Sequence, residues 1–479
     1  MAVVDRRHEA VLTAVSLMSI VGGVMLALWS VPSDVAPEGA LAASGMWMCL
    51  GLGCAVGTDV IFRGLGGVFR AEQIIMPGIA YFLLVDLVQG LYPVTASADA
   101  VRAAFIAIGL FAGGCVLARM IPPLRLPRTI AELMTAEYSE GRLLAVLVGF
   151  FALGMFRFFW ASGFSIEVML EGLGAPRFSA PWSRGQFGGS DALTDALINF
   201  GYPLGTLTVM LALRGRRWVN WKVGVGVLLS AIFLLFVAQG GARRLVGVVV
   251  GAGLFTWACG SRSRLRLASA LGILVTVAAL LGAMNVLLEA RNEGWAEYVY
   301  EAPGSGVVRV DDNFLRLAQT IEAVPESHPH IGFQWIWYLI VRPVPRILWA
   351  GKPVDPGFSL PDYLGFEDVS LSISVVGDWY LGFGWPGVLL GGLLFGVLGR
   401  TWSQMLGDGM TVKALGVYGF GVMVLFLGIR SMIELILLCY PLILWMLVDR
   451  LLRRRPDTGR GHTAPGIVRH QRSSVGNAS

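Results

Sequence analysis

The sequence predicts an all-α membrane protein, a bundle of about twelve spanning helices with one large extracytoplasmic loop. Hydrophobic residues make up 55% of the 479 residues and charged residues only 14%, whereas a soluble chain carries about 25% charge. Apolar runs of spanning length recur along the chain, and most basic residues lie in short connections between them. These three observations exclude a soluble globule. They also exclude nucleic-acid binding, which needs basic side chains clustered on a folded face.

Each predicted span is an apolar run near the length of about 20 residues that crosses a bilayer as a helix. The first run lacks a convincing Ala-x-Ala cleavage pattern after it, so we expect it to remain as an anchor. The twelve runs are residues 10–31, 41–62, 74–92, 101–118, 143–161, 192–213, 223–238, 245–260, 267–288, 381–399, 412–429 and 431–449.

The basic residues predict the orientation, because short cytoplasmic loops carry an excess of Lys and Arg. With the N-terminus inside, cytoplasmic segments contain 24 of the 37 Lys and Arg residues. Both termini are then cytoplasmic, and residues 451–479 form a basic, polar tail. The nine spans of residues 1–288 and the three of residues 381–450 flank a loop, residues 289–380, on the outside.

This loop of 92 residues holds 6 basic and 13 acidic residues. Residues 311–324 have the pattern of an amphipathic helix that Asp311 and Asp312 cap, with an apolar face made of Phe314, Leu317, Ala318, Ile321 and Val324. Residues 333–341 are aromatic and too short to span. We expect both segments to lie across the outer mouth of the bundle.

Several arginines break the positive-inside pattern. Arg243 and Arg244 lie in a hairpin that the topology places outside, between spans of only 16 residues or so, about 24 Å. The turn is therefore expected at headgroup depth or slightly below, where two guanidinium groups need an anionic partner. Arg430 lies in a similar outside turn. Snorkelling to lipid phosphates is the alternative for these residues, and the favoured one for Arg157.

The end of the large loop is the densest group of polar and aromatic residues. Arg342, Arg346 and Lys352 lie on a Pro- and Gly-stiffened stretch and are candidates for phosphate recognition. Trp349, Trp379 and Tyr380 are candidates for contacts with sugar rings, although an aromatic belt at the membrane surface explains them as well. Asp378, His330 and His328 are candidates for a general base.

Other chemistry is weakly indicated. No His, Cys or carboxylate cluster has metal-ligand spacing, and no Walker-type glycine loop is present, so we expect no metal and no cofactor. The five cysteines lie inside apolar runs, as packing residues do. Asp86 is expected to make a structural hydrogen bond to a neighbouring helix, and Asp59 to lie near the inner interface.

The stretch from Arg342-Pro-Val-Pro-Arg346 through Lys352-Pro353 to Gly377-Asp-Trp-Tyr-Leu-Gly-Phe-Gly384 resembles the Wzy-type oligosaccharide repeat-unit polymerases, which make O-antigen and exopolysaccharide. Gly240-Gly-Ala-Arg-Arg244 is similar to the Gly-Ser-Arg-Gly-like turn of that family. The family often has Gly-Glu-x-Tyr-x-x-Phe-Gly before a late span, and here Asp378 replaces the glutamate. The resemblance is densest over residues 240–430.

The resemblance implies a metal-independent, GT-C-like glycosyltransferase in the bacterial inner membrane, active at the outer leaflet. Its substrates would be glycans linked to undecaprenyl pyrophosphate, with membrane lipids around it and a chain-length regulator and a flippase of the same pathway as possible partners. The cations named above would bind pyrophosphate. An O-antigen ligase and a lipid-linked oligosaccharide flippase or other transporter remain alternatives, although repeated halves, typical of transporters, are not evident.

Overall fold

The computed structural model describes most of the chain, and every regular element in the described part is a helix. The described residues are 6–126, 137–176, 179–183, 191–215, 218–240, 243–261, 275–277, 279–280, 282–283, 286, 308–342, 344, 349–353, 355–366, 371–407 and 410–452. Nearly all of the predicted tail, residue Arg346 and most of the predicted ninth span, residues 267–288, lie outside them.

Ten helical segments of the described chain are long and apolar enough to cross a membrane, and the protein is therefore a multi-pass membrane protein. With the shorter helix α18, they coincide with eleven of the twelve predicted spans. The ten segments are Arg7–Trp29, Ala42–Arg63, Ala71–Gln89, Ala98–Met120, Glu140–Ala161, Leu193–Gly215, Trp221–Gln239, Arg244–Ser261, Ser374–Ser403 and Met432–Leu451.

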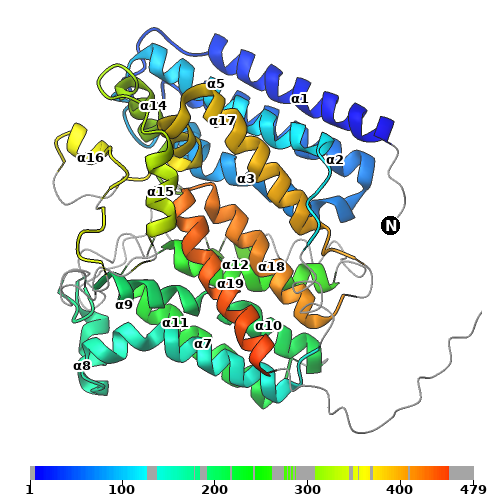
Figure 1. Ribbon diagram of the computed structural model, residues 1–479, viewed down its shortest axis with the longest axis vertical. Helices are drawn as coiled ribbons and strands as arrows, with labels where there is room; N and C mark the ends of the chain where they lie inside the picture. The colour runs from blue at the N-terminus through cyan, green and yellow to red at the C-terminus, as the bar shows by residue number, and fades with distance from the viewer. Residues whose placement is uncertain are drawn as a thin grey trace, which may run out of the picture.

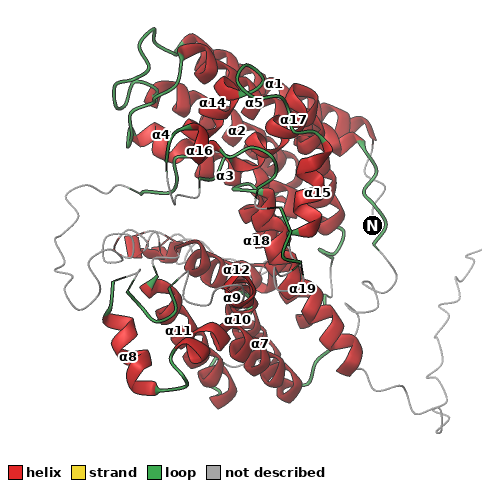
Figure 2. Cartoon of the chain, turned by 60° about the vertical axis from the view of Figure 1, so that its left-hand side comes forward, coloured by secondary structure: helices red, strands yellow, loops and turns green. Residues whose placement is uncertain are grey.

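The helices form two groups joined by the last two helices of the chain (Figure 2). The first group is α1 (Arg6–Trp29), α2 (Ala42–Arg63), α3 (Ile75–Ile79), α4 (Val85–Gln89), α5 (Ala98–Leu117) and α17 (Ser374–Ser403). The second is α7 (Glu140–Ala161), α9 (Asp191–Ile198), α10 (Leu204–Gly215), α11 (Trp221–Gln239) and α12 (Arg243–Ser261). Between them lie α18 (Val412–Gly428) and α19 (Met432–Leu452).

Four short helices gather at one end of the bundle. They are α8 (Ile166–Gly174), α14 (Asn313–Ala323), α15 (Phe333–Val341) and α16 (Leu360–Tyr363). Figure 1 shows all four on the left, whereas α1 begins on the right. We call the left-hand side the loop end, because it carries the described part of the predicted large loop.

Helix α14 packs between α5 and α17, so it is part of the bundle and does not lie loosely over its mouth. The five residues of its predicted apolar face are all buried, as the pattern indicated. The capping prediction is wrong: the Asp312 side chain makes no cap hydrogen bond. Asp312 pairs instead with Arg316, and Asp311 pairs with Arg430, because each carboxylate has a guanidinium within reach.

Helix α17 begins at Ser374, seven residues before the predicted start of the span at 381, so residues 377–383 are helical. The helix breaks at Gly384, whose φ of 63° and ψ of −149° suit glycine. Pro386, which has no N–H, leaves the carbonyl of Gly382 without its helical donor. The N–H of Gly332, just before α15, donates to that carbonyl at 2.8 Å, so α15 is attached to α17 at the break.

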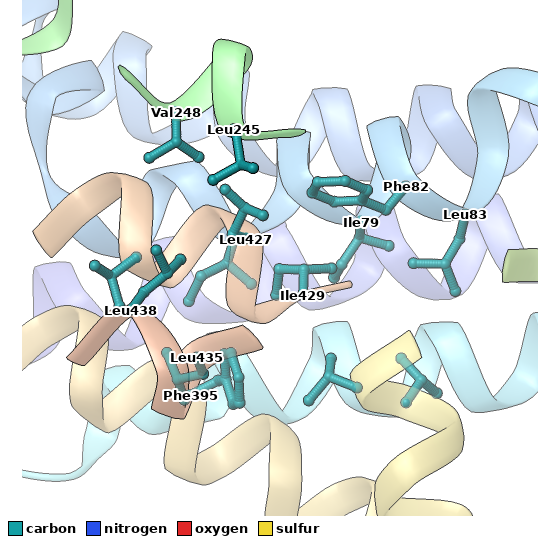
Figure 3. Packing of buried hydrophobic residues seen from close by; sticks show 14 of the residues in the cluster. Ile79, Phe82, Leu83, Leu245, Val248, Phe395, Leu427, Ile429, Leu435 and Leu438 are labelled. Carbon is teal, nitrogen blue, oxygen red and sulfur yellow. The ribbon is translucent and has the colours of Figure 1, made fainter. Parts of the chain in front are cut away.

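Buried apolar side chains fix where α12 starts (Figure 3). Leu245 and Val248 of α12 face Leu427 of α18, and Leu435 and Leu438 of α19 belong to the same core. Because Leu245 is buried in this core, Arg244, the residue before it, lies at the edge of the core, at the loop end of the bundle. The helices α11 and α12 have 19 residues each, about 28 Å, so they are longer than predicted and the short-span argument loses most of its force.

The opposite end is held by ion pairs among residues that the topology assigns to the cytoplasmic side. Asp59, almost fully buried, pairs with Arg119, which fits its expected place near the interface. Burial acts to lower the pKa of Arg70, outside the spans, but Glu72 beside it more than offsets this and raises the pKa.

Candidate functional site

Five charged residues from four parts of the chain meet at the start of α19, at the loop end. They are Arg244 of α12, Asp311 before α14, Asp378 of α17, and Arg430 and Glu434 around the α18–α19 turn. We call these five residues the α19 cluster. At this cluster, ion pairs connect the second group of helices and the large loop to the α18–α19 turn and the start of α19.

The centre of the cluster is Glu434, a buried carboxylate on the first turn of α19. Its Oε1 accepts from Arg244 Nη1 and, at 3.3 Å, from Arg430 Nη1. Arg430 also donates through Nε to Asp311 Oδ2 at 2.7 Å. The side chain of Arg244 is 38% exposed and that of Arg430 is 21% exposed, so neither arginine side chain is fully covered.

Asp378 is buried near Arg430 and Glu434, on the face of α17 that meets the start of α19. Its Oδ2 accepts the backbone N–H of Met432 at 2.9 Å and the hydroxyl of Ser431 at 3.4 Å. A carboxylate at a helix N-terminus satisfies one of the unpaired N–H groups and interacts favourably with the helix dipole. Asp378 therefore caps α19 and contacts the two residues that follow Arg430 in the chain, Ser431 and Met432.

The turn between α18 and α19 is held by its backbone. Ile429 is fully buried, and its carbonyl accepts from Val375 N–H at 3.0 Å. The carbonyl of Arg430 accepts from the Ser372 hydroxyl at 2.9 Å. The residues before and at the start of α17 thus hold the turn, and the Arg430 side chain is presented from a rigid backbone.

Two of the predicted phosphate-binding residues of the large loop have other partners. Lys352 Nζ donates to the carbonyls of Arg342 at 2.5 Å and Val344 at 2.8 Å, so its ammonium group holds the loop together. Arg342 donates to the hydroxyl of Tyr338 and lies over that ring, 5.3 Å from its centre. The structure does not bring them to the α19 cluster. The side chain of Arg243 lies outside the described part of the chain.

The three aromatic rings predicted to contact sugars differ in their exposure to solvent. Trp379 and Tyr380 are buried, because this part of α17 is packed against α15 and the segment before it. Trp379 packs against Trp335 with ring centres 5.0 Å apart, and the Tyr380 hydroxyl donates to the Val324 carbonyl at 3.1 Å. Both rings are therefore covered by protein in this structure, whereas Trp349 is exposed.

The two candidate histidines lie on the segment between α14 and α15. Nδ1 of His328 is 2.7 Å from the carbonyl of Pro329, and the His330 ring is edge-on to Tyr380 near the α17 break. Neither imidazole contacts the α19 cluster among the described residues. Asp378 is the candidate base that lies with the arginines.

Two residues show what the sequence reasoning missed. Glu434 was not singled out, although its place four residues after Arg430 is the spacing of an ion pair on one helical face. Arg157 is only 1% exposed, so the snorkelling interpretation is wrong. Its guanidinium donates to the carbonyls of Trp182 and Ser183 and to the Thr194 hydroxyl, at 2.9–3.1 Å.

Asp86 makes the structural hydrogen bond expected of it, accepting from Val310 N–H at 2.8 Å, although the donor is a loop and not a helix. No group of three His, Cys, Asp or Glu side chains within the described ranges could hold a metal ion. Comparisons with family models, with curated proteins and with solved structures found no match. The class that fold and site define is a multi-pass helical membrane protein with a charged cluster at one end of the bundle.

Proposed function

We propose that the protein is a GT-C-like membrane glycosyltransferase that polymerises repeat units linked to a polyprenyl pyrophosphate, at the extracytoplasmic face. The observation that carries the proposal is the α19 cluster: two partly exposed arginines share one carboxylate, and a buried aspartate lies beside them. The resemblance of residues 240–430 to Wzy-type polymerases supports the same reading.

The reaction is the attack of a sugar hydroxyl of one lipid-linked glycan on the anomeric carbon of another. The new glycosidic bond forms as the bond to the pyrophosphate breaks, and the lipid pyrophosphate leaves with the bonding electrons. In the proposal, Arg244 and Arg430 stabilise the negative charge that develops on the leaving group. Asp378 accepts the proton of the attacking hydroxyl.

The guanidinium groups have donors for this role. Arg244 contacts Glu434 through Nη1, and Arg430 uses Nε and Nη1. The Nη2 groups of both, and Nε of Arg244, are not used in these contacts. A planar guanidinium with five N–H donors can bind a carboxylate on one edge and a phosphate on another.

The proposal is tested with purified protein in vesicles, using as substrate the lipid-linked repeat units extracted from a strain that lacks the gene. We expect products longer than one repeat and one lipid pyrophosphate released for each bond formed. Transfer of glycan to lipid A-core, without elongation, would show a ligase instead. Movement of the substrate between leaflets without new bonds would show a transporter.

A further inference from the structure

Helix α8 lies crosswise to the spanning helices at the loop end, in the connection between α7 and α9. Figure 1 shows it running across the direction of α7 and α11. The hydroxyl of Ser165 caps its start by accepting from Val168 N–H at 3.5 Å. Its inner side packs on the protein through Met169 and Gly172.

The outer edge of α8 is apolar and exposed. Ile166 is 74% exposed and Leu170 is 64% exposed, one helical turn apart. The edge continues through Phe164 to Trp160 at the end of α7, both more than half exposed. Trp160 in turn stacks on Phe156 of α7, so the exposed edge is continuous with the outer surface of a membrane-spanning segment.

The backbone before α8 is in a conformation that residues with side chains rarely adopt. Phe164 has a φ of 62°, which is strained for a residue other than glycine. Its ring stacks on Phe159 and stays on the exposed edge. Burial of a Phe side chain in an apolar phase is favourable, and it offsets this strain only where the edge is covered.

The length of α7 gives the depth of α8 in the bilayer. The 22 residues of α7 extend about 33 Å, close to the hydrocarbon core of about 30 Å. At its far end Glu140 pairs with Lys222 at 2.6 Å, as charges at headgroup level do. The other end of α7, where α8 follows within five residues, then lies at the opposite headgroup level.

We propose that α8 is an interfacial helix whose apolar edge, Phe164, Ile166 and Leu170, inserts into the acyl chains of the leaflet at the loop end. The partner is the lipid surface itself. The helix carries Glu167 and Glu171, both exposed, and no basic residue, so apolar insertion and not attraction to anionic headgroups holds it. This inference does not rest on the proposed function.

Gln239, the last residue of α11, connects α8 to the part of the chain that leads to the α19 cluster. Its side chain donates to the carbonyl of Ala175, directly after α8, at 2.8 Å, and accepts from Trp182 Nε1 at 2.9 Å. Helix α12, with Arg244, begins four residues after Gln239. In this arrangement α8 sets the height of Arg244 relative to the bilayer.

The test places single nitroxide labels at 166, 167, 170 and 171 in a variant whose five native cysteines are replaced, in vesicles of zwitterionic lipid. Collisions with oxygen, which concentrates in acyl chains, are compared with those of a water-soluble nickel chelate. We expect a ratio of oxygen to nickel collisions roughly threefold or more higher at 166 and 170 than at 167 and 171. Val148→Cys on the exposed face of α7 is the lipid control, and Glu326→Cys in the exposed loop is the water control.

Equal access of nickel to all four positions would show that α8 lies in water and would overturn the proposal. Shielding of 166 and 170 from both reagents would also overturn it, because a protein and not lipid would then cover the edge. Anionic lipid in the vesicles should leave the pattern unchanged. Labelled variants are used only if they elute as a single species at the position of the parent protein.

Discussion

Arg244 of α12 and Arg430 of the α18–α19 turn donate to the same oxygen atom, Oε1 of Glu434. The carboxylate is buried, and its two partners lie 190 and four residues away from it in sequence. One negative charge therefore holds two positive charges close together at the loop end. This arrangement links the second group of helices to the last helix, and both arginine side chains remain partly exposed.

Glu434→Gln should lower the stability of the purified protein by about 1–3 kcal/mol. Breaking a fully buried ion pair typically costs about 3–5 kcal/mol, and the partial exposure of both arginines reduces this. Thermal unfolding in detergent measures the change. Glu322→Gln, at a loop-end carboxylate that accepts from Ser97 N–H, is the control and should have a smaller effect. An unchanged melting temperature in Glu434→Gln would contradict the role of Glu434.

Arg244→Ala should reduce polymer formation about tenfold or more, since one charged hydrogen bond contributes on the order of 1.5–3 kcal/mol. Arg244→Lys should restore part of the activity, because it keeps the charge and loses the planar fork. We expect the same of Arg243, whose side chain lies outside the described residues. Glycan length on a gel measures the effect in a strain lacking the chromosomal gene.

Arg102→Ala is the matched control for Arg244. Arg102 pairs with Asp99 on α5, and both are exposed. Each variant is compared at equal membrane abundance. Full-length polymer from the double variant Arg243→Ala, Arg244→Ala would mean that these arginines are lipid anchors, and the pyrophosphate site would have to be sought at Arg430 and Arg342.

Asp378→Asn should lower polymerisation more than His328→Ala does. Asparagine keeps the size of the side chain and an oxygen that accepts the Met432 N–H, so α19 remains capped, but the proton acceptor is lost. His328 lies on a loop, with Nδ1 near a backbone carbonyl. Normal polymer from Asp378→Asn would remove Asp378 as the base and make His330 the next candidate.

The topology can be tested by cysteine labelling in intact cells with a reagent that does not cross the membrane. Ser305→Cys, in the large loop, should be labelled, and Ser479→Cys, in the basic tail, should not, because the Lys and Arg bias places them on opposite sides. The parent chain gives the background of the native cysteines. The reverse pattern would invert the topology and move the α19 cluster to the cytoplasmic side.

Hydropathy was sufficient to predict the spans, because a helix that crosses lipid must be apolar along its whole length, whatever its neighbours. Hydropathy could not predict where α17 begins. The first turns of this helix, which include Asp378, are buried in the protein interior. The buried face of α14 could be predicted from the helical spacing of its apolar residues. The partner of Asp311 could not be predicted in this way, because Arg430 is 119 residues away in sequence.

The candidate site was predictable in part. Arg244, Arg430 and Asp378 stood out because charge near an apolar run is costly and needs a reason. Their meeting at Glu434 depends on long-range packing that a single sequence does not contain. The contacts of Lys352 were unpredictable for a similar reason, since nothing local shows that its ammonium group binds two carbonyls of its own loop.

The most direct test of the proposed polymerase is the length distribution of surface glycan in a strain from which the gene is deleted. We predict that single repeat units replace the ladder of long chains, and that the wild-type gene restores the ladder whereas Arg244→Ala, expressed at the same level, does not. An unchanged ladder in the deletion strain, or long chains that accumulate on the lipid carrier as a ligase defect would leave them, would contradict the proposal.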